Sequence, residues 1–242
     1  MYCLKAIIFD FDGVLADTEP LHYRMFERVL GEQGIVLTYE EYERRYIGLT
    51  DEECFQAVCE AQRRPLSGRI LRNLMAYKTE LMQQALCEQR VLIPGVQGFV
   101  KAAAERYRLA IASGALRKEI ELVLDHAGLR DLFEHISSAE DVSQGKPQPD
   151  LYLHAVAWLN ASRPLRPSEC LAIEDTAYGV TAAQRAGLRC LAVATSLDPI
   201  HLAHADAVMV RLGDCDLSPL IRRFWAGSAT GRVRSLPGVT QP

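Results

Sequence analysis

The sequence lacks three features that would place it in other classes of protein. Its seven cysteines include no Cys-x-x-Cys pair, no apolar stretch reaches the roughly 20 residues of a membrane-spanning helix, and no long basic block runs along the chain. Scattered cysteines in odd number favour reduced thiols over a disulfide framework. We therefore expect a cytoplasmic protein that has no secretory leader and no membrane partner.

The charge balance argues against a nucleic-acid partner. Lys and Arg together number 27 and Asp and Glu 31, which leaves a formal net charge of -4 and no electrostatic basis for binding a polyanion. With 242 residues, of which 49% are hydrophobic and 24% charged, the chain has the composition of a globular protein with a sizeable core. We expect two lobes and, by default, a monomer.

Apolar runs and helical patterns divide the chain into an α/β part and a helical part. No convincing strand lies from about Leu21 to Gln89, where Thr38, Thr50 and Ser67 carry helix-start signals. From Val91 onward, short apolar strands alternate with helical patterns, which is typical of a Rossmann-like parallel sheet with helices on both faces. The predicted strands end at Phe9, Ala112, Ile173, Val193 and Val210.

These patterns predict an α/β catalytic core with an inserted all-helical cap domain. The core comprises residues 1–18 and 91–227, and the cap comprises residues 19–90. Residues 228–242 are rich in Gly, Ser, Thr, Pro and Arg, so they hold too little apolar surface to offset their ordering entropy. We expect this segment to be a flexible tail and assign it no function.

Polar residues follow three of the predicted strands directly. Asp10 comes after the first run, Ser113 after the second, and Glu174 and Asp175 after the third. In parallel sheets, ligands bind beyond the carboxyl ends of the strands, so these positions are the expected site. Each has a structural alternative, because an Asp-Gly turn can cap a strand and Ser or acidic residues can cap the helix that follows.

An EF-hand calcium loop is excluded for the first acidic pair. That loop needs glycine at its sixth position and an acid at its twelfth. With Asp10 as the first position, Gly13 is the fourth and Leu21 the twelfth. The polar positions fall into four short motifs along the chain: Asp10-x-Asp12-Gly13-Val14-x-x-Asp17-Thr18, Ser113, Lys146-Pro147 and Glu174-Asp175. In this order they resemble the four motifs of the haloacid-dehalogenase superfamily. The helical insertion resembles the cap of its β-phosphoglucomutase-like phosphatase branch.

The resemblance implies phosphoryl transfer with Mg²⁺. Asp10 would be the nucleophile that forms an aspartyl phosphate, and Asp12 would protonate the leaving group and then deprotonate water. The metal ligands would be Asp10, the backbone carbonyl of Asp12, Asp175 and, directly or through water, Glu174. Ser113 would bind a phosphoryl oxygen and Lys146 would neutralise the transferring group, although an exposed loop lysine is the alternative for Lys146. No other cofactor is required.

The expected substrate is a small phosphorylated metabolite, most simply a sugar phosphate. Candidate residues for binding it are His22, Thr50, Asp51, Gly114 and Arg117. His22 lies twelve residues after Asp10, the spacing of a hinge histidine in β-phosphoglucomutase, and its alternative is an ordinary polar position on the first cap helix. The expected role of the cap is substrate specificity.

Hydrolysis is favoured over the mutase reaction, which is the alternative. The mutase cap loop carries Gly-x-Ser-Arg, but this chain reads Gly48-Leu49-Thr50-Asp51, and a carboxylate repels a second phosphate. Arg117, Arg44 or Arg45 remain candidates for a replacement cation. The acid at position 12 argues against dehalogenase and ion-pump chemistry. Phosphonatases form a Schiff base on a cap lysine, for which Lys78 is the candidate, and Asp12 makes this the poorer interpretation. A binding protein without turnover is the third hypothesis.

Overall fold

The computed structural model describes residues 3–47 and 49–225, and the chain forms two compact units. The first unit comprises residues 1–17 and 91–242 and the second comprises residues 18–90. Gly48 and the predicted tail at 228–242 lie outside the described residues. The seven cysteines are all unpaired, and none of the described helices combines the length and apolarity needed to cross a bilayer.

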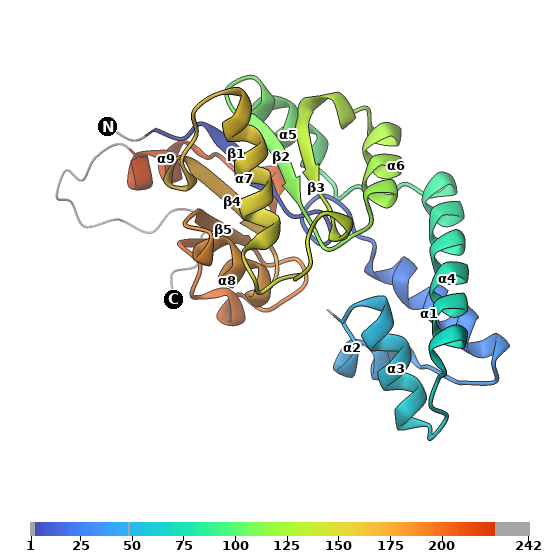
Figure 1. The fold of residues 1–242 in the computed structure, drawn as a ribbon. Helices are drawn as coiled ribbons and strands as arrows, with labels where there is room; N and C mark the ends of the chain where they lie inside the picture. The colour runs from blue at the N-terminus through green and yellow to red at the C-terminus, as the bar shows by residue number, and fades with distance from the viewer. Residues whose placement is uncertain (1–2, 48, 226–242) are drawn as a thin grey trace. The chain divides into compact units, whose positions relative to one another are not determined.

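A six-stranded parallel sheet forms the centre of the first unit (Figure 1). Its strand order is β3-β2-β1-β4-β5-β6, so the chain starts in the middle of the sheet and builds outward on both sides. Continuous apolar runs form the central strands because both of their faces are covered. The strands are β1 (Ala6–Phe9), β2 (Arg108–Ala112), β3 (Phe133–Ser137), β4 (Cys170–Glu174), β5 (Arg189–Val193) and β6 (Ala207–Met209).

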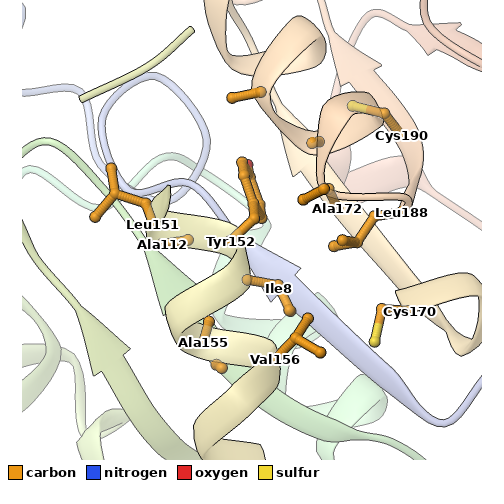
Figure 2. Packing of buried hydrophobic residues seen from close by; sticks show 14 of the residues in the cluster. Ile8, Ala112, Leu151, Tyr152, Ala155, Val156, Cys170, Ala172, Leu188 and Cys190 are labelled. Carbon is orange, nitrogen blue, oxygen red and sulfur yellow. The ribbon is translucent and has the colours of Figure 1, made fainter. Parts of the chain in front are cut away.

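Helices pack on both faces of this sheet, which confirms the predicted α/β class. Side chains alternate between faces along a strand: Ile8 belongs to the cluster with residues of α7 and α8 (Figure 2), whereas the neighbouring Phe9 meets Phe99 of α5 edge-on at 6.2 Å between ring centroids. The helices are α5 (Val96–Ala104), α6 (Arg117–Ala127), α7 (Asp150–Ser162), α8 (Ala177–Arg185) and α9 (Ser218–Trp225).

The edge strand β3 was not among the predicted strands. Its centre is polar, because Glu134 and His135 interrupt the apolar pattern that marks the other strands. Tertiary contacts offset this: Glu134 forms an ion pair with Arg108 of the adjacent strand at 2.6 Å, and His135 stacks on Trp158 of α7 at 4.8 Å between centroids. Neither contact has a local signature in the sequence.

His135 provides a prediction about stability. Burial, followed by the positive fields of His154 and Arg117, lowers the pKa of His135 to about 4. The unfolded chain, with a histidine pKa near 6.5, therefore binds more protons than the folded chain between pH 4 and 6.5. The stabilising contribution is present above pH 6.5 and is lost as pH falls through this window, by roughly 1–2 kcal/mol after solvent screening of this partly buried ring.

The measurement is urea unfolding of the wild type and His135→Phe from pH 4 to 7.5. Phenylalanine keeps the stack on Trp158 but does not titrate, so the difference between the two free energies of unfolding isolates the contribution of His135. We expect the wild type to lose stability relative to the variant on acidification. A pH-independent difference contradicts the prediction.

The described residues of the second unit form four helices and their connections. They are α1 (Glu19–Glu32), α2 (Tyr39–Arg45), α3 (Asp51–Ala61) and α4 (Gly68–Glu88). The three predicted helix starts are correct: the side chains of Thr38, Thr50 and Ser67 each accept a bond from a backbone N–H of the first turn, and Thr50 forms the complete capping box with Glu53. These bonds satisfy N–H groups that have no partner within the helix.

The core of the helical unit is aromatic at its centre. Phe26 of α1 packs against Phe55 of α3 at 5.0 Å and against Tyr42 of α2 at 5.8 Å between ring centroids. Tyr42 is 3% exposed and its hydroxyl donates to Glu19 at 2.5 Å. Three helices are thus joined through one ring cluster, which accounts for the compactness of a unit that contains none of the named strands.

Candidate active site

Four polar side chains gather at the carboxyl edge of the sheet, because β2, β1 and β4 are parallel neighbours that end level with one another. Asp10 follows β1, and its N–H still donates to the Ile173 carbonyl at 2.9 Å. Glu174 is the last residue of β4, Asp175 follows it, and Ser113 follows β2. The expected convergence of strand ends thus brings three acids to one place, with Ser113 at the end of the neighbouring strand.

Lys146 joins this group from the loop before α7. Its Nζ lies 2.8 Å from Oδ1 of Asp10 and 2.7 Å from Oε1 of Glu174, and its side chain is only 11% exposed. The alternative of an exposed loop lysine is therefore wrong. Burial alone would lower the pKa of Lys146, but the charges of Asp10 and Glu174 outweigh burial and raise this pKa above its ordinary value, which keeps the ammonium charged.

The acids carry more negative charge than one lysine neutralises. Burial, followed by the charge of Asp10, raises the pKa of Glu174 to about 7. Burial and the charges of Asp10 and Glu174 likewise raise the pKa of Asp175 well above its usual range. Buried carboxylates that repel one another in this way need a further cation to be fully ionised at neutral pH.

The same three acids have the arrangement of a divalent-cation site. One carboxylate oxygen from each of Asp10, Glu174 and Asp175 lies within 4.8 Å of the others. Oδ1 of Asp175 is buried and has no hydrogen-bond partner among the described residues, although a buried carboxylate oxygen without a partner is costly. Hard oxygen ligands of this kind suit Mg²⁺, so the residues present fit that ion.

Asp12 lies in the turn that follows Asp10. The turn needs glycine next to Asp12, because Gly13 has φ +71°, and a Cβ built on it would lie 2.6 Å from Cγ of Asp175. The backbone therefore passes directly against the acidic cluster. Asp12 is half-buried and bridges to Ala16 through the backbone, which closes the turn beside the site.

Ser113 is buried and belongs to the strand end rather than to a helix cap. Its N–H donates to the Ser137 carbonyl at 2.9 Å and its Oγ accepts from the Ala115 N–H at 3.1 Å. The following helix, α6, has Leu116 at its N-cap position with no side-chain bond, so the capping alternative for Ser113 is wrong. Gly114, next to it, is exposed and has space around its Cα.

The guanidinium of Arg117 already has hydrogen-bond and ion-pair partners within the first unit. Its guanidinium donates to Asp141 at 2.6 Å and to the Ile136 carbonyl at 2.9 Å. This pairing ties the start of α6 to the end of β3. A charged partner and a carbonyl already occupy Arg117, which weakens it as the replacement for the absent loop arginine.

Two residues of the site were not found from the sequence. Tyr152 of α7 is fully buried and donates its hydroxyl to Oε1 of Glu174 at 2.7 Å, the oxygen that also contacts Lys146. Ser196, beyond β5, donates to Oδ2 of Asp175. A usable signal existed for Tyr152, because a tyrosine on the core face of an apolar helix needs a buried acceptor for its hydroxyl.

Glu174 fits its site because residue 179 has no side chain. Its other oxygen, Oε2, accepts from the Asp175 N–H at 3.3 Å and from the Thr176 hydroxyl at 3.4 Å. Thr176, rather than either acid, is the N-cap of α8, so the helix-cap alternative for Glu174 and Asp175 is wrong. A Cβ on Gly179 would lie 2.0 Å from Cδ of Glu174, closer than any real contact.

Gly179→Ala is therefore expected to displace the Glu174 carboxylate and to destabilise the first unit by about 1–3 kcal/mol, the usual cost of overpacking. Gly98→Ala is the matched control, since Gly98 also lies within a helix but a Cβ added to it would meet nothing within 4 Å. There, alanine should stabilise by about 0.5–1 kcal/mol through helix propensity. Thermal unfolding of both variants measures this, and equal shifts of the melting temperature contradict the packing account.

The helical unit holds the candidate cap residues in a polar network of its own. Lys78 of α4 is 1% exposed, and its Nζ lies 2.5 Å from Oδ1 of Asp51 and 2.8 Å from Nδ1 of His22. The same ammonium lies 4.3 Å from the centroid of the Phe26 ring. Burial, followed by the charge of Lys78, lowers the pKa of His22 well below its usual value. Thr50 is engaged with Glu53 in its capping box.

The arrangement defines an α/β protein with an acidic, lysine-containing site at the carboxyl edge of a parallel sheet and a helical insertion after the first strand. The chain belongs to the haloacid dehalogenase-like hydrolase family, whose model matches residues 7–193. The matched residues include most of the sheet, the insertion, the three clustered acids and Asp12 in the adjoining turn.

Named relatives and a solved structure agree with this membership. The protein YhcW of Bacillus subtilis is 34% identical over 191 residues, which cover 78% of this chain and 83% of that protein. The phosphorylated carbohydrates phosphatase of Thermotoga maritima is 33% identical over 188 residues, covering 76% and 82% respectively. The crystal structure of CbbY from Rhodobacter sphaeroides in complex with phosphate matches with a TM-score of 0.78 and 27% identity over 89% of this chain and 96% of that one.

Proposed function

We propose that this protein is an Mg²⁺-dependent phosphatase that hydrolyses a small phosphorylated metabolite, most simply a sugar phosphate, through an aspartyl-phosphate intermediate. The observation that carries the proposal is the buried cluster at the sheet edge. There, Lys146 forms ion pairs with both Asp10 and Glu174, and Asp175 lies beside these two acids. Phosphoryl transfer through a covalent intermediate needs an anionic nucleophile, a fixed positive charge for the phosphoryl oxygens and oxygen ligands for a metal ion, and this cluster contains all three kinds of group.

Four residues would hold the metal ion. They are the carboxylates of Asp10 and Asp175, the backbone carbonyl of Asp12, and Glu174 either directly or through water. The unpartnered Oδ1 of Asp175 and the repulsion among the acids support this set. When bound, Mg²⁺ supplies positive charge that lets an anionic carboxylate approach an anionic phosphate.

Asp10 and Asp12 have different roles in the reaction: Asp10 is the nucleophile, and Asp12 transfers protons. A carboxylate oxygen of Asp10 forms a bond to phosphorus while the ester P–O bond breaks, and Asp12 gives its proton to the departing alkoxide. Water then attacks the phosphorus of the aspartyl phosphate, Asp12 takes a proton from that water, and the bond between Asp10 and phosphorus breaks to release inorganic phosphate. The enzyme returns to its starting protonation state.

Lys146 and Ser113 act on the phosphoryl oxygens in this proposal. Lys146 offsets the charge that spreads over those oxygens in the transition state, and its two carboxylate partners hold the ammonium in place before substrate arrives. Ser113, whose backbone is anchored to Ser137, donates its hydroxyl to one oxygen. Gly114 beside it has no side chain to block that approach.

The substrate class rests on the named relatives and on the helical unit. A phosphorylated carbohydrates phosphatase that is 33% identical to this chain supports a sugar phosphate. We propose that His22, Thr50 and Asp51 contribute substrate selection, with Asp51 and His22 held through Lys78. Reduced thiols in the seven unpaired cysteines are consistent with a cytoplasmic location, which we include in the proposal.

Hydrolysis remains favoured over the mutase alternative. Asp51, at the position of the mutase arginine, forms an ion pair with Lys78, and Arg117 forms one with Asp141. Asp51 is an acid, and the positive charges of Lys78 and Arg117 are already compensated by their carboxylate partners. None of these residues offers a free positive charge for the second phosphate of a bisphosphate. These pairings favour a monophosphorylated substrate.

The test is phosphate release across a panel of phosphorylated metabolites with and without Mg²⁺. A parallel assay contains β-glucose 1-phosphate and glucose 1,6-bisphosphate and follows glucose 6-phosphate. We expect Mg²⁺-dependent phosphate release without isomerisation. Glucose 6-phosphate formation with little free phosphate would establish the mutase instead, and no turnover of any ester would favour a binding protein that has lost catalysis.

A further inference from the structure

Ser196 contacts the acidic cluster from the turn after β5, a strand that supplies none of the acids. It lies three residues beyond the end of β5, in a turn where the Thr195 N–H donates to the Val193 carbonyl at 2.9 Å. Its hydroxyl donates a hydrogen bond to Oδ2 of Asp175. The residue is exposed overall, so an apolar core does not account for the direction of its hydroxyl.

The two oxygens of Asp175 therefore have different surroundings. Oδ2 has Ser196 as its donor, and the Cα of Gly13 is so close that a Cβ there would lie 2.6 Å from the Ser196 Oγ. Oδ1 is buried and has no partner among the described residues. A carboxylate rotates about one bond, and a donor on one oxygen therefore determines where the other oxygen points.

We propose that Ser196 is a positioning residue for the metal site, which fixes Asp175 so that Oδ1 is presented to the divalent cation. The inference rests on the proposed function for the identity of the cation. The hydroxyl occupies one oxygen and restricts the rotation of the carboxylate, so less ordering is left to be done when the ion binds. Partners of this kind, bonded to a metal-binding side chain, typically change metal affinity 10–100-fold when they are removed.

The structure gives Ser196 a role separate from that of Lys146. Lys146 contacts Asp10 and Glu174, whereas Ser196 contacts Asp175. Removing the Ser196 hydroxyl leaves the buried lysine and its two ion pairs in place. The expected defect is therefore in metal binding, and a raised Mg²⁺ requirement should account for any loss of turnover.

The test measures Mg²⁺ binding to the free enzyme by isothermal titration calorimetry, with Mn²⁺ binding followed by electron paramagnetic resonance. Ser196→Ala should weaken both ions 10–100-fold, Ser196→Thr should restore affinity to within a few-fold of the wild type, and both should unfold at nearly the wild-type temperature. Thr195→Val is the control, because it removes a neighbouring hydroxyl that makes no hydrogen bond to Asp175 in the described structure.

Wild-type Mg²⁺ affinity in Ser196→Ala overturns the inference, and it does so even if the protein proves to be an active phosphatase. Equal weakening in Ser196→Ala and Thr195→Val also overturns it, because the effect then belongs to the turn and not to the hydroxyl. Conversely, selective weakening in Ser196→Ala supports the inference even if no phosphate ester is hydrolysed, since binding is measured without substrate. The two proposals can therefore fail separately.

Discussion

Asp10→Asn is expected to abolish turnover, lowering kcat by on the order of 10⁴-fold or more, as loss of a covalent nucleophile does in other enzymes. The amide has nearly the shape of the carboxylate but cannot form the aspartyl phosphate. Asn also removes the negative charge that pairs with Lys146 at 2.8 Å. The measurement is Mg²⁺-dependent phosphate release with the best substrate of the panel.

The fold should survive this change. The negative charge of Asp10 contributes to the repulsion that raises the pKa of both Glu174 and Asp175. Neutralising Asp10 therefore reduces the repulsion among the acids, and this offsets the loss of its ion pair with Lys146. We expect a melting temperature within a few degrees of the wild type. Asp125→Asn, on the exposed surface of α6, is the control for an Asp-to-Asn change and should retain full activity. Turnover retained in Asp10→Asn would rule out the nucleophile assignment.

Asp12→Asn should lower hydrolysis of sugar phosphates by about 10²–10⁴-fold, the usual contribution of general acid–base catalysis. The effect should depend on the leaving group. An alkoxide needs a proton from Asp12, whereas p-nitrophenolate leaves without one, so the first step with p-nitrophenyl phosphate should be far less impaired. The second step still needs Asp12 to deprotonate water, and the phosphorylated enzyme should therefore accumulate.

A rapid-mixing experiment with p-nitrophenyl phosphate separates these steps. We expect a burst of p-nitrophenolate close to one equivalent, followed by slow turnover, and an intact mass that is larger by one phosphoryl group. Asp10→Asn serves as the comparison, because it should give neither burst nor mass increase. Equal impairment of both substrates with no phosphorylated enzyme would contradict the assignment of Asp12 as the acid and base.

Much of the fold follows from local patterns. Apolar runs such as Cys170–Ile173 mark strands covered on both faces, and the cap signals at Thr38, Thr50 and Ser67 mark helix starts, because each depends on residues a few positions apart. The strand β3 escaped this reasoning. Its polar centre is stabilised by Arg108 and Trp158, which are distant in sequence, so no local window contains the cause.

The candidate site also contains residues that local patterns could place and one that they could not. Asp10, Ser113 and the Glu174–Asp175 pair could be placed together from the sequence because each lies where a predicted parallel strand ends. Lys146 could not be placed by that argument, and only the resemblance to a family indicated it, because a loop residue has no periodicity. Its distances to Asp10 and Glu174 depend on how α7 packs over the sheet.

The sequence by itself thus determined the class of fold, the helical insertion, and which acids stand at the strand ends, because periodicity and strand termini are local properties. Only the tertiary structure decided which groups contact those acids: Lys146 between two carboxylates, Tyr152 on Glu174, Ser196 on Asp175. These partners come from separate loops and helices. Their distances are set by the packing of whole elements against one another, and no short stretch of sequence encodes that packing.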